Sequence, residues 1–244
     1  MKDLPTLPTE LVLEIASILC ASSQRDYTTL LLVSRTLRDF CRLTYLPVVP
    51  IVLTTPQRTA QFAGYLRTDS DIAPRIRRLW ITKDDYGIIP QCTNLTTLTC
   101  DGNDLIPIIS SDIFYHTQLT NLTIMGLWEF WTRFVGAKKG RTLCGQLQKL
   151  WLLDHLFLRG IQMEWLSSLK ELSYWSVELY GRQDQFKGEL ETLNALPRLK
   201  KLQVYMRSPS PSIFSQLCRI NDRRLEVISW GKRSEVAEWI DQSI

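Results

Sequence analysis

Apolar residues recur along the chain in a short pattern whose first, fourth and sixth positions are apolar. The clearest copy is Leu95-Thr-Thr-Leu-Thr-Cys100, which Asp-Gly-Asn103 follows. Seven copies begin at Ile76, Leu95, Leu119, Leu147, Leu169, Leu199 and Leu225. Successive first positions are separated by 19, 24, 28, 22, 30 and 26 residues. Because side chains alternate across a strand, the fourth and sixth residues point to one side, so the pattern predicts seven short strands over a shared core.

One such unit cannot bury its apolar face alone, so the copies must stack. Their pattern and spacing resemble leucine-rich repeats, which are about 20 to 29 residues long. The resemblance implies an α/β fold, a curved leucine-rich-repeat solenoid with a parallel sheet on its concave side and helices and loops on its convex side. Only Asn103 occupies the Asn position that, in this family, bonds backbone across turns. We therefore expect an irregular solenoid.

The first fifty residues lack the repeat and show helical spacing instead. A first amphipathic helix is indicated by Leu11, Ile15, Ile18 and Leu19. Thr9 is a candidate cap for its start. A second helical run begins near Asp26 and extends to Cys41, with an apolar surface too wide for one neighbour. A small helical module with surplus apolar surface either holds a partner or docks on the first repeat.

Two motifs in this module, Leu7-Pro-Thr-Glu-Leu11 and Leu32-Val-Ser-Arg35, resemble the F-box over residues 4 to 48. The resemblance implies binding to the Skp-type adaptor of a cullin-RING ubiquitin ligase. Contact roles implied by it fall on Leu7, Pro8, Leu11, Ile15, Leu31, Val33 and Arg35. The family often has a Trp a few residues after the Arg of the second motif, and this chain has Leu37 in its place. The chain also departs from the family at the polar link from Ala21 to Arg25, which is expected to lengthen the first turn between helices.

The chain is thus expected to comprise an F-box helical module (1–50), a linker with a capping helix (51–75), and the solenoid with a C-terminal capping helix (76–244). Thr55-Pro56 predicts the start of the linker helix. Its expected inward residues are Phe62, Tyr65 and Leu66. Helices of the convex side are indicated by Leu127, Trp128, Trp131, Phe134 and Val135, and by Phe186, Leu190, Leu193 and Leu196. The closing helix is indicated by Val236, Trp239 and Ile240.

Composition argues against catalysis and against strong nucleic-acid binding. The formal charge of +4 and the pI of about 8.7 are only mildly basic. The six cysteines form no CxxC pair and are interpreted as buried apolar groups. Neither histidine, His116 nor His155, lies in a catalytic motif, and both are expected at the surface. Gly136 to Thr142 is too short for a phosphate-binding loop and lacks its Lys, and Asp84-Asp85 is interpreted as a solvated turn. No metal, cofactor or catalytic residue is expected.

No stretch has the length or apolar character of a signal peptide or a membrane span. We therefore expect a protein of the cytoplasm, the nucleus or both, with reduced thiols. No membrane association is expected.

The third, fifth and seventh positions of each copy face away from the core and define a concave surface. Three tryptophans and one tyrosine fall there, and aromatic and basic residues are enriched at binding hot spots. The residues predicted to bind a target protein are Arg78, Trp80, Lys149, Trp151, Glu171, Trp175, Lys201 and Tyr205. The alternative is that irregular turns fold over Trp151 and Trp175 and bury them.

Three functions remain open. The first, implied by the resemblance, is a substrate-recognition subunit of an SCF-type ubiquitin ligase, in which the F-box binds the adaptor and the repeats bind the target. The layout is similar to F-box proteins common in fungi. The second is a leucine-rich-repeat scaffold that binds proteins without a ligase. The third, the least favoured, is nucleic-acid binding through Arg75, Arg77, Arg78, Lys138, Lys139, Arg141, Lys200, Lys201, Arg223 and Arg224.

Overall fold

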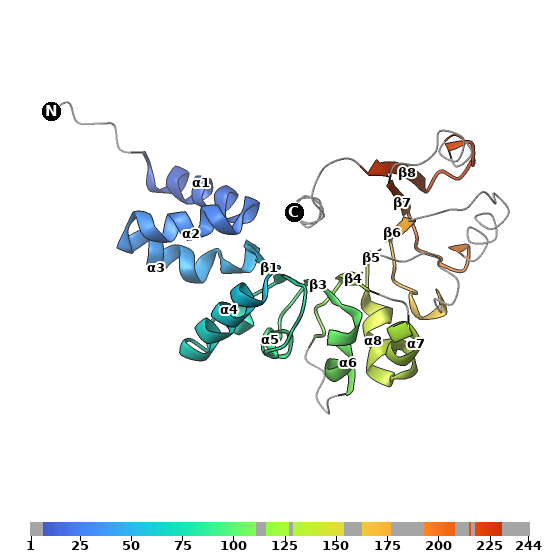
Figure 1. The fold of residues 1–244 in the computed structure, drawn as a ribbon. Coiled ribbons are helices and arrows are strands. Elements are labelled where there is room, and N and C mark those ends of the chain that lie inside the picture. The colour runs from blue at the N-terminus through green and yellow to red at the C-terminus, as the bar shows by residue number, and fades with distance from the viewer. Residues whose placement is uncertain are drawn as a thin grey trace.

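Eight short parallel strands, stacked in sequence order, form one curved sheet (Figure 1). The computed structural model describes residues 7–110, 116–126, 129–153, 163–176, 193–207, 215 and 218–230. The strands are β1 (Pro50–Leu53), β2 (Arg78–Ile81), β3 (Thr97–Asp101), β4 (Asn121–Met125), β5 (Lys149–Leu152), β6 (Glu171–Ser176), β7 (Lys201–Arg207) and β8 (Leu225–Trp230). Every neighbouring pair is parallel. The predicted leucine-rich-repeat architecture is therefore confirmed at the level of the fold.

The apolar positions of the repeat make the core, as predicted. Leu98 and Cys100 of β3 are both inaccessible to solvent, and so is Leu95 before the strand. The equivalent residues of β4 and β5 are buried in the same cluster. Burying one such side chain contributes about 1.5 to 3 kcal/mol. Stacking of the repeats is therefore driven by the positions that define the pattern.

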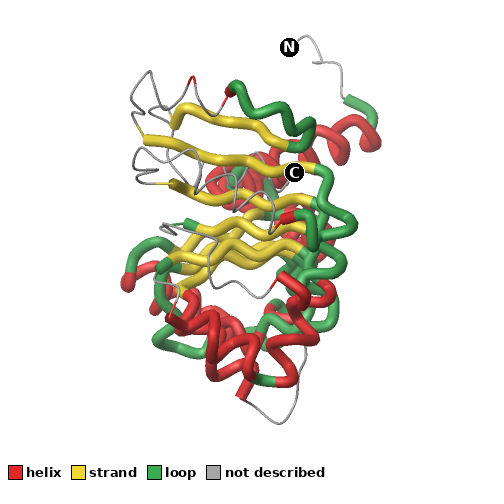
Figure 2. The backbone as a smooth tube through the Cα atoms, turned by 90° about the vertical axis from the view of Figure 1, so that its right-hand side faces the viewer, coloured by secondary structure: helices red, strands yellow, loops and turns green. Residues whose placement is uncertain are grey.

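Helices cover the outer side of the sheet (Figure 2). The α-helices are α1 (Thr9–Ser22), α2 (Gln24–Val33), α3 (Arg35–Thr44), α4 (Pro56–Thr68), α5 (Ile88–Gln91), α6 (Gly102–Ser110), α7 (Glu129–Gly136) and α8 (Lys138–Gln146). Short 3-10 helices are η1 (Leu46–Val48), η2 (Ala73–Arg75) and η3 (Met163–Trp165). Helices α4 to α8 lie along the convex side, whereas α1 to α3 form a separate group beyond β1 (Figure 1).

The sheet has one strand more than the seven predicted. β1 comes from the segment expected to be a linker, and its Ile51 pairs with Leu79 of β2. Its four residues are all buried. β1 was not predicted as part of the sheet because Pro50-Ile-Val-Leu53 is a continuous apolar run without the spacing of the repeat. The solenoid therefore begins at β1.

The last predicted repeat was placed in the wrong register. Leu202 pairs with Leu225 and Val204 with Val227, so Leu225 occupies the fourth position of its repeat and not the first. The copy begins at Asp222, and it was not recognised because the repeat pattern requires an apolar residue at its first position. A displacement of three residues exchanges the two sides of a strand. Ile228, expected in the core, consequently packs on the concave side.

The N-terminal module has three helices where two runs were predicted. Ser34 is extended, with φ −155° and ψ 159°, and its Oγ accepts a hydrogen bond from Leu37 N at 3.1 Å, so it ends α2 and caps α3. Thr9 is the first residue of α1 and not its cap, a position taken by Pro8. The link from Ala21 to Arg25 does not lengthen the turn, because only Ser23 separates α1 from α2.

The helix predicted after Thr55-Pro56 is present as α4, and the Thr55 side chain accepts a hydrogen bond from Arg58 N at 3.3 Å. Its buried residues are Thr59, Ala63 and Leu66. Leu66 was therefore placed correctly, but Tyr65 is exposed. Phe62, the other residue expected on the inward side, is only half-buried.

The aromatic helix predicted on the convex side is α7, and its Trp131, Phe134 and Val135 are buried. It packs on α8 so closely that a Cβ added to Gly140 would lie 1.8 Å from the Phe134 carbonyl oxygen. Leu193 and Leu196 are buried as well. The other residues of the predicted convex and closing helices, Leu127, Trp128, Phe186, Leu190, Val236, Trp239 and Ile240, lie outside the described residues.

Three single-residue expectations are wrong. His116 is buried, which lowers the pKa of its imidazole, while His155 lies outside the described residues. Cys218 is exposed, unlike the other five cysteines. Asn103 bonds to Asp101 Oδ1 of its own turn, at 3.0 Å. Asn94 is one of the side chains that do bond between repeats, since its Nδ2 donates to the Pro74 carbonyl at 2.8 Å.

Candidate functional site

The N-terminal module is fixed to the first strand by polar contacts on one side of its helices. The Val52 N–H donates to Gln24 Oε1 at 3.0 Å, which joins α2 to β1. The Arg42 guanidinium of α3 forms an ion pair with Asp69, just after α4. Within the module, Tyr45 Oη donates to the Leu13 carbonyl at 2.6 Å. These contacts set the orientation of the module against the solenoid.

Several apolar side chains on the helices of the module are exposed, and no element among the described residues covers them. Leu11 is 45% exposed, Ile15 49%, Ile18 63%, Leu32 78% and Val33 64%. We call these five residues the apolar face. They lie on α1 and at the end of α2, two helices that pack against each other. The alternative in which this face docks on the first repeat is therefore wrong.

The residues predicted to contact an adaptor lie on or beside the apolar face. Leu7 is exposed, as are Pro8 before α1 and Arg35 at the start of α3. Leu31 is half-buried and packs against the core of the module, so it is the least available of the set. Ile18 and Leu32 were not predicted to contact an adaptor, although the helical spacing of the first helix includes Ile18.

The predicted aromatic part of the concave surface is closed to solvent. Trp80 is 2% exposed, Trp151 4% and Tyr205 1%, and all three belong to one apolar cluster with Val52 and Leu153. The rings of Trp151 and Tyr205 have centroids 5.5 Å apart. The prediction of an open aromatic surface is wrong for these three residues, and the burial that the alternative expected is confirmed for Trp151. Trp175 lies on β6 opposite Tyr205, but its side chain is outside the described part.

Arg78 is also removed from the predicted surface. Its side chain is buried, and its Nη1 donates to the Val48 carbonyl at 2.8 Å. Burial lowers the pKa of the guanidinium. Arg78 therefore ties β2 to the segment before β1 and is not part of the accessible concave surface.

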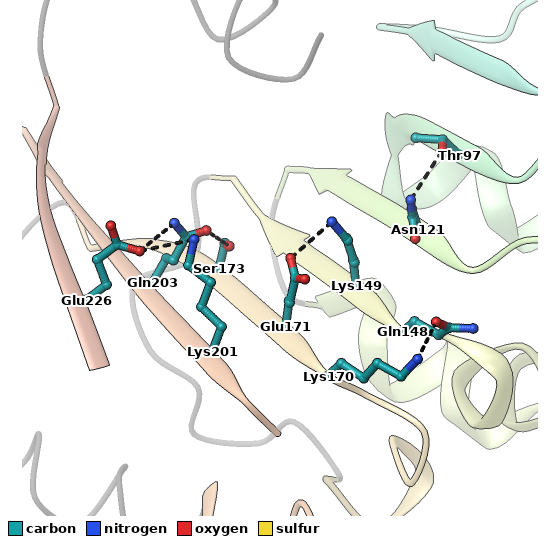
Figure 3. Close-up of polar contacts among 10 residues, drawn as sticks. All are labelled: Thr97, Asn121, Gln148, Lys149, Lys170, Glu171, Ser173, Lys201, Gln203 and Glu226. Atoms are coloured by element: carbon teal, nitrogen blue, oxygen red, sulfur yellow. Dashed lines mark hydrogen bonds and ion pairs between the residues drawn. The ribbon is translucent and has the colours of Figure 1, made fainter. Parts of the chain in front are cut away.

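Four charged residues near the start of the last strands are accessible on the concave side. They are Lys149, Glu171, Lys201 and Glu226, and we call them the charged row (Figure 3). Lys149 Nζ lies 3.2 Å from Glu171 Oε2, and Lys201 Nζ lies 3.1 Å from Glu226 Oε2. Strand register brings them together, since Lys149 pairs with Glu171 and Glu171 with Lys201. Three of the four were predicted from the sequence.

Glu226 was missed because the register of β8 was misplaced. Its Oε2 also accepts a hydrogen bond from Gln203 Nε2 at 2.9 Å, and Gln203 Oε1 accepts one from Ser173 Oγ at 3.0 Å (Figure 3). Burial opposes ionisation of Glu226, but the bonds from Gln203 and Lys201 outweigh it and lower the pKa of the carboxyl. Lys201 and Glu226 of the charged row are thus held in a network across β6, β7 and β8, and Lys149 and Glu171 form a separate pair between β5 and β6.

The residues of the nucleic-acid hypothesis do not form one surface. Arg78 is buried, and Arg224 is paired with Asp222 at 2.7 Å. Arg141 Nη1 donates to the carbonyls of Val135 and Gly136, both at 3.2 Å, so it caps the end of α7. The described positions of this set are therefore divided between the sheet edge and a convex helix.

The acidic residues after β2 and β3 have structural partners. Asp84 accepts hydrogen bonds from Ile88 N at 2.7 Å and Ile89 N at 2.9 Å, so its carboxylate caps α5. Asp84 N in turn donates to Asp104 Oδ2 at 3.0 Å. The described residues contain no group of three or more side chains suited to hold a metal ion. No helix among them is long and apolar enough to cross a membrane.

Comparison with protein-family models finds no match, and comparison with curated proteins finds none either. Among solved structures, one that resembles this chain is internalin C2 from Listeria monocytogenes. The likeness covers 76% of this chain and 74% of that one, at 14% sequence identity and a TM-score of 0.36. The assignment of the fold rests on the parallel sheet and its buried repeat positions.

Proposed function

We propose that this protein is a substrate-recognition subunit of an SCF-type cullin-RING ubiquitin ligase. In this proposal the N-terminal module is an F-box that binds the Skp-type adaptor, and the solenoid binds the target protein. The chain itself performs no chemistry. It raises the effective concentration of target lysines near the charged conjugating enzyme, as any tether between two binding sites does.

The single observation that supports the adaptor half is the exposed apolar face. Ile18, Leu32 and Val33 are the most exposed large apolar side chains among the described residues, with 63%, 78% and 64% of their surface accessible. Contiguous apolar surface on a soluble domain marks an interaction site. The face lies in the segment that carries the F-box-like motifs, and its partner is therefore proposed to be the adaptor that those motifs imply.

For the target half, the buried concave aromatics leave the charged row as the proposed contact. Lys149, Glu171 and Lys201 are half-exposed, and Glu226 is exposed. Charges in this position favour selectivity and rapid encounter more than raw affinity. A target with complementary charges is proposed to lie across the starts of β5 to β8.

The adaptor half is tested with the purified chain and a purified Skp-type adaptor. Leu11→Asp combined with Ile15→Asp puts two charges into the proposed interface, where an unpaired buried charge costs on the order of 3 kcal/mol or more. We expect the affinity for the adaptor to fall at least about a hundredfold. Both side chains are half exposed (45% and 49%) in the free chain, so the variant is expected to fold.

Tyr86→Asp is the matched control, because Tyr86 is 42% exposed and lies outside the module. It should bind the adaptor like the unchanged chain, and circular dichroism should show the same helix content in all proteins. An unchanged chain that fails to bind the adaptor would support the scaffold function in place of the ligase function.

A further inference from the structure

A cavity of about 550 Å³ opens where the helical module meets the solenoid. Its walls come from α2 on one side and α4 on the other, and Leu53 of β1 belongs to its lining. This volume lies within the range of about 300 to 1,000 Å³ that is typical of small-molecule sites. It is separate from both the apolar face and the charged row.

The charged groups that line the cavity are two arginines. Arg25 comes from α2 and Arg58 from α4, and both are exposed. Within the described residues, neither guanidinium takes part in an ion pair or a hydrogen bond. The neighbouring carboxylate of Asp26 is engaged by Ser23, whose Oγ donates to it at 2.9 Å, and it is not part of the lining. The cavity therefore carries two positive charges without a described counter-charge.

Neutral polar groups and aromatic rings complete the lining. The side-chain oxygen of Gln24 accepts from Val52 N, which leaves its amide nitrogen as the donor available to the cavity. Gln61 of α4 adds a second amide. Phe62 and Tyr65, whose ring centroids are 6.3 Å apart, supply an apolar wall. The donors suit an oxyanion, and the rings suit a flat or apolar group attached to it.

We propose that this cavity binds a small phosphate monoester with an aromatic or apolar organic group. A guanidinium presents a planar fork of donors that matches phosphate oxygens, and two of them balance the double charge of a monoester. A carboxylate carries one negative charge in place of two and forms the paired hydrogen bonds with only one guanidinium. Arg58 lies in the first turn of α4, which holds no acidic residue, so the helix end adds a field of the same sign.

The binding probe is phenyl phosphate, titrated into the full-length chain by isothermal titration calorimetry. We expect saturable binding of one phenyl phosphate per chain. Inorganic phosphate lacks the ring and benzoate lacks the second charge, so each should bind at least about fivefold more weakly. Arg25→Ala combined with Arg58→Ala should weaken phenyl phosphate binding about tenfold or more.

Arg75→Ala combined with Arg198→Ala is the matched control, because both side chains are exposed and neither lines the cavity. It should bind phenyl phosphate like the unchanged chain. The absence of saturable binding would overturn the proposal, and so would equal affinity in the Arg25→Ala, Arg58→Ala variant. Benzoate binding as tightly as phenyl phosphate would overturn the assignment to a phosphate. Thermal unfolding of each variant, expected to be unchanged, verifies that the fold is intact.

Discussion

At the scale of single residues, the sequence pattern correctly predicted the side of the strand on which a side chain lies. It did not predict whether that side is exposed to solvent. Leu98 and Cys100 are buried as expected. Trp80 and Trp151 also lie on the predicted side, but they are buried too. Alternation along a strand is a local property of the backbone. Burial of these aromatic side chains depends on how residues of different strands pack into one cluster, which the repeat pattern does not specify.

Asp104 is a residue whose environment the sequence did not indicate. Burial is the largest of the effects that raise the pKa of its carboxyl to about 6, and the charges of Asp101 and Asp84 act in the same direction. An acid with a raised pKa in the folded state binds protons there that the unfolded chain has already lost. The contribution of Asp104 to stability therefore falls as the pH rises from about 4, the usual pKa of Asp, to about 6.

Asp104→Asn should consequently stabilise the fold at pH 7 and leave it unchanged at pH 4. The Asn side-chain oxygen can still accept the hydrogen bond from Asp84 N. Because Asp104 is partly solvated, the expected gain at pH 7 is only about 1 kcal/mol. Urea unfolding at both pH values measures it. Asp71→Asn, which removes an exposed carboxylate that does not act on the pKa of Asp104, is the control. A gain that is equal at pH 4 and pH 7 would contradict the account.

At the scale of elements, strands with the full repeat were predicted and those without it were missed or displaced. β1 has no LxxLxL spacing, and the repeat of β8 begins with the polar Asp222. The division of α2 from α3 depends on a single extended residue, Ser34, within a continuous apolar run. A local pattern indicates which side chains fill the core. Strand pairing and the ends of helices also depend on contacts with adjacent elements.

The packing of α7 on α8 can be tested with two glycines of the same helix. Gly140→Ala would place a methyl group 1.8 Å from the Phe134 carbonyl oxygen, so the backbones must separate. We expect a loss of about 1 to 3 kcal/mol in the free energy of unfolding. At Gly145 an added Cβ meets nothing within 4 Å, so Gly145→Ala should stabilise α8 by about 0.5 to 1 kcal/mol. If urea unfolding showed Gly140→Ala to be more stable than Gly145→Ala, the described packing of α7 on α8 would be contradicted.

At the scale of the whole molecule, two surfaces are separated by a curved sheet. The helical module stands beyond β1 at one end (Figure 1), and the charged row lies on the last four strands (Figure 3). The sheet is continuous between them, so it holds the two at a set separation. Such an arrangement suits a protein that keeps two partners side by side. The sequence predicted this layout because each part has its own hydrophobic period, helical in the first fifty residues and repeat-like afterwards.

Hydrogen–deuterium exchange of the full-length chain, with and without a purified Skp-type adaptor, tests the central claim most directly. The account predicts slower exchange in α1 and α2, where the apolar face lies, and unchanged exchange in β3 to β6. Leu11→Asp combined with Ile15→Asp should abolish the protection. No protection of α1 and α2 at saturating adaptor, or protection confined to the solenoid, would contradict the claim that the N-terminal module is the adaptor-binding part.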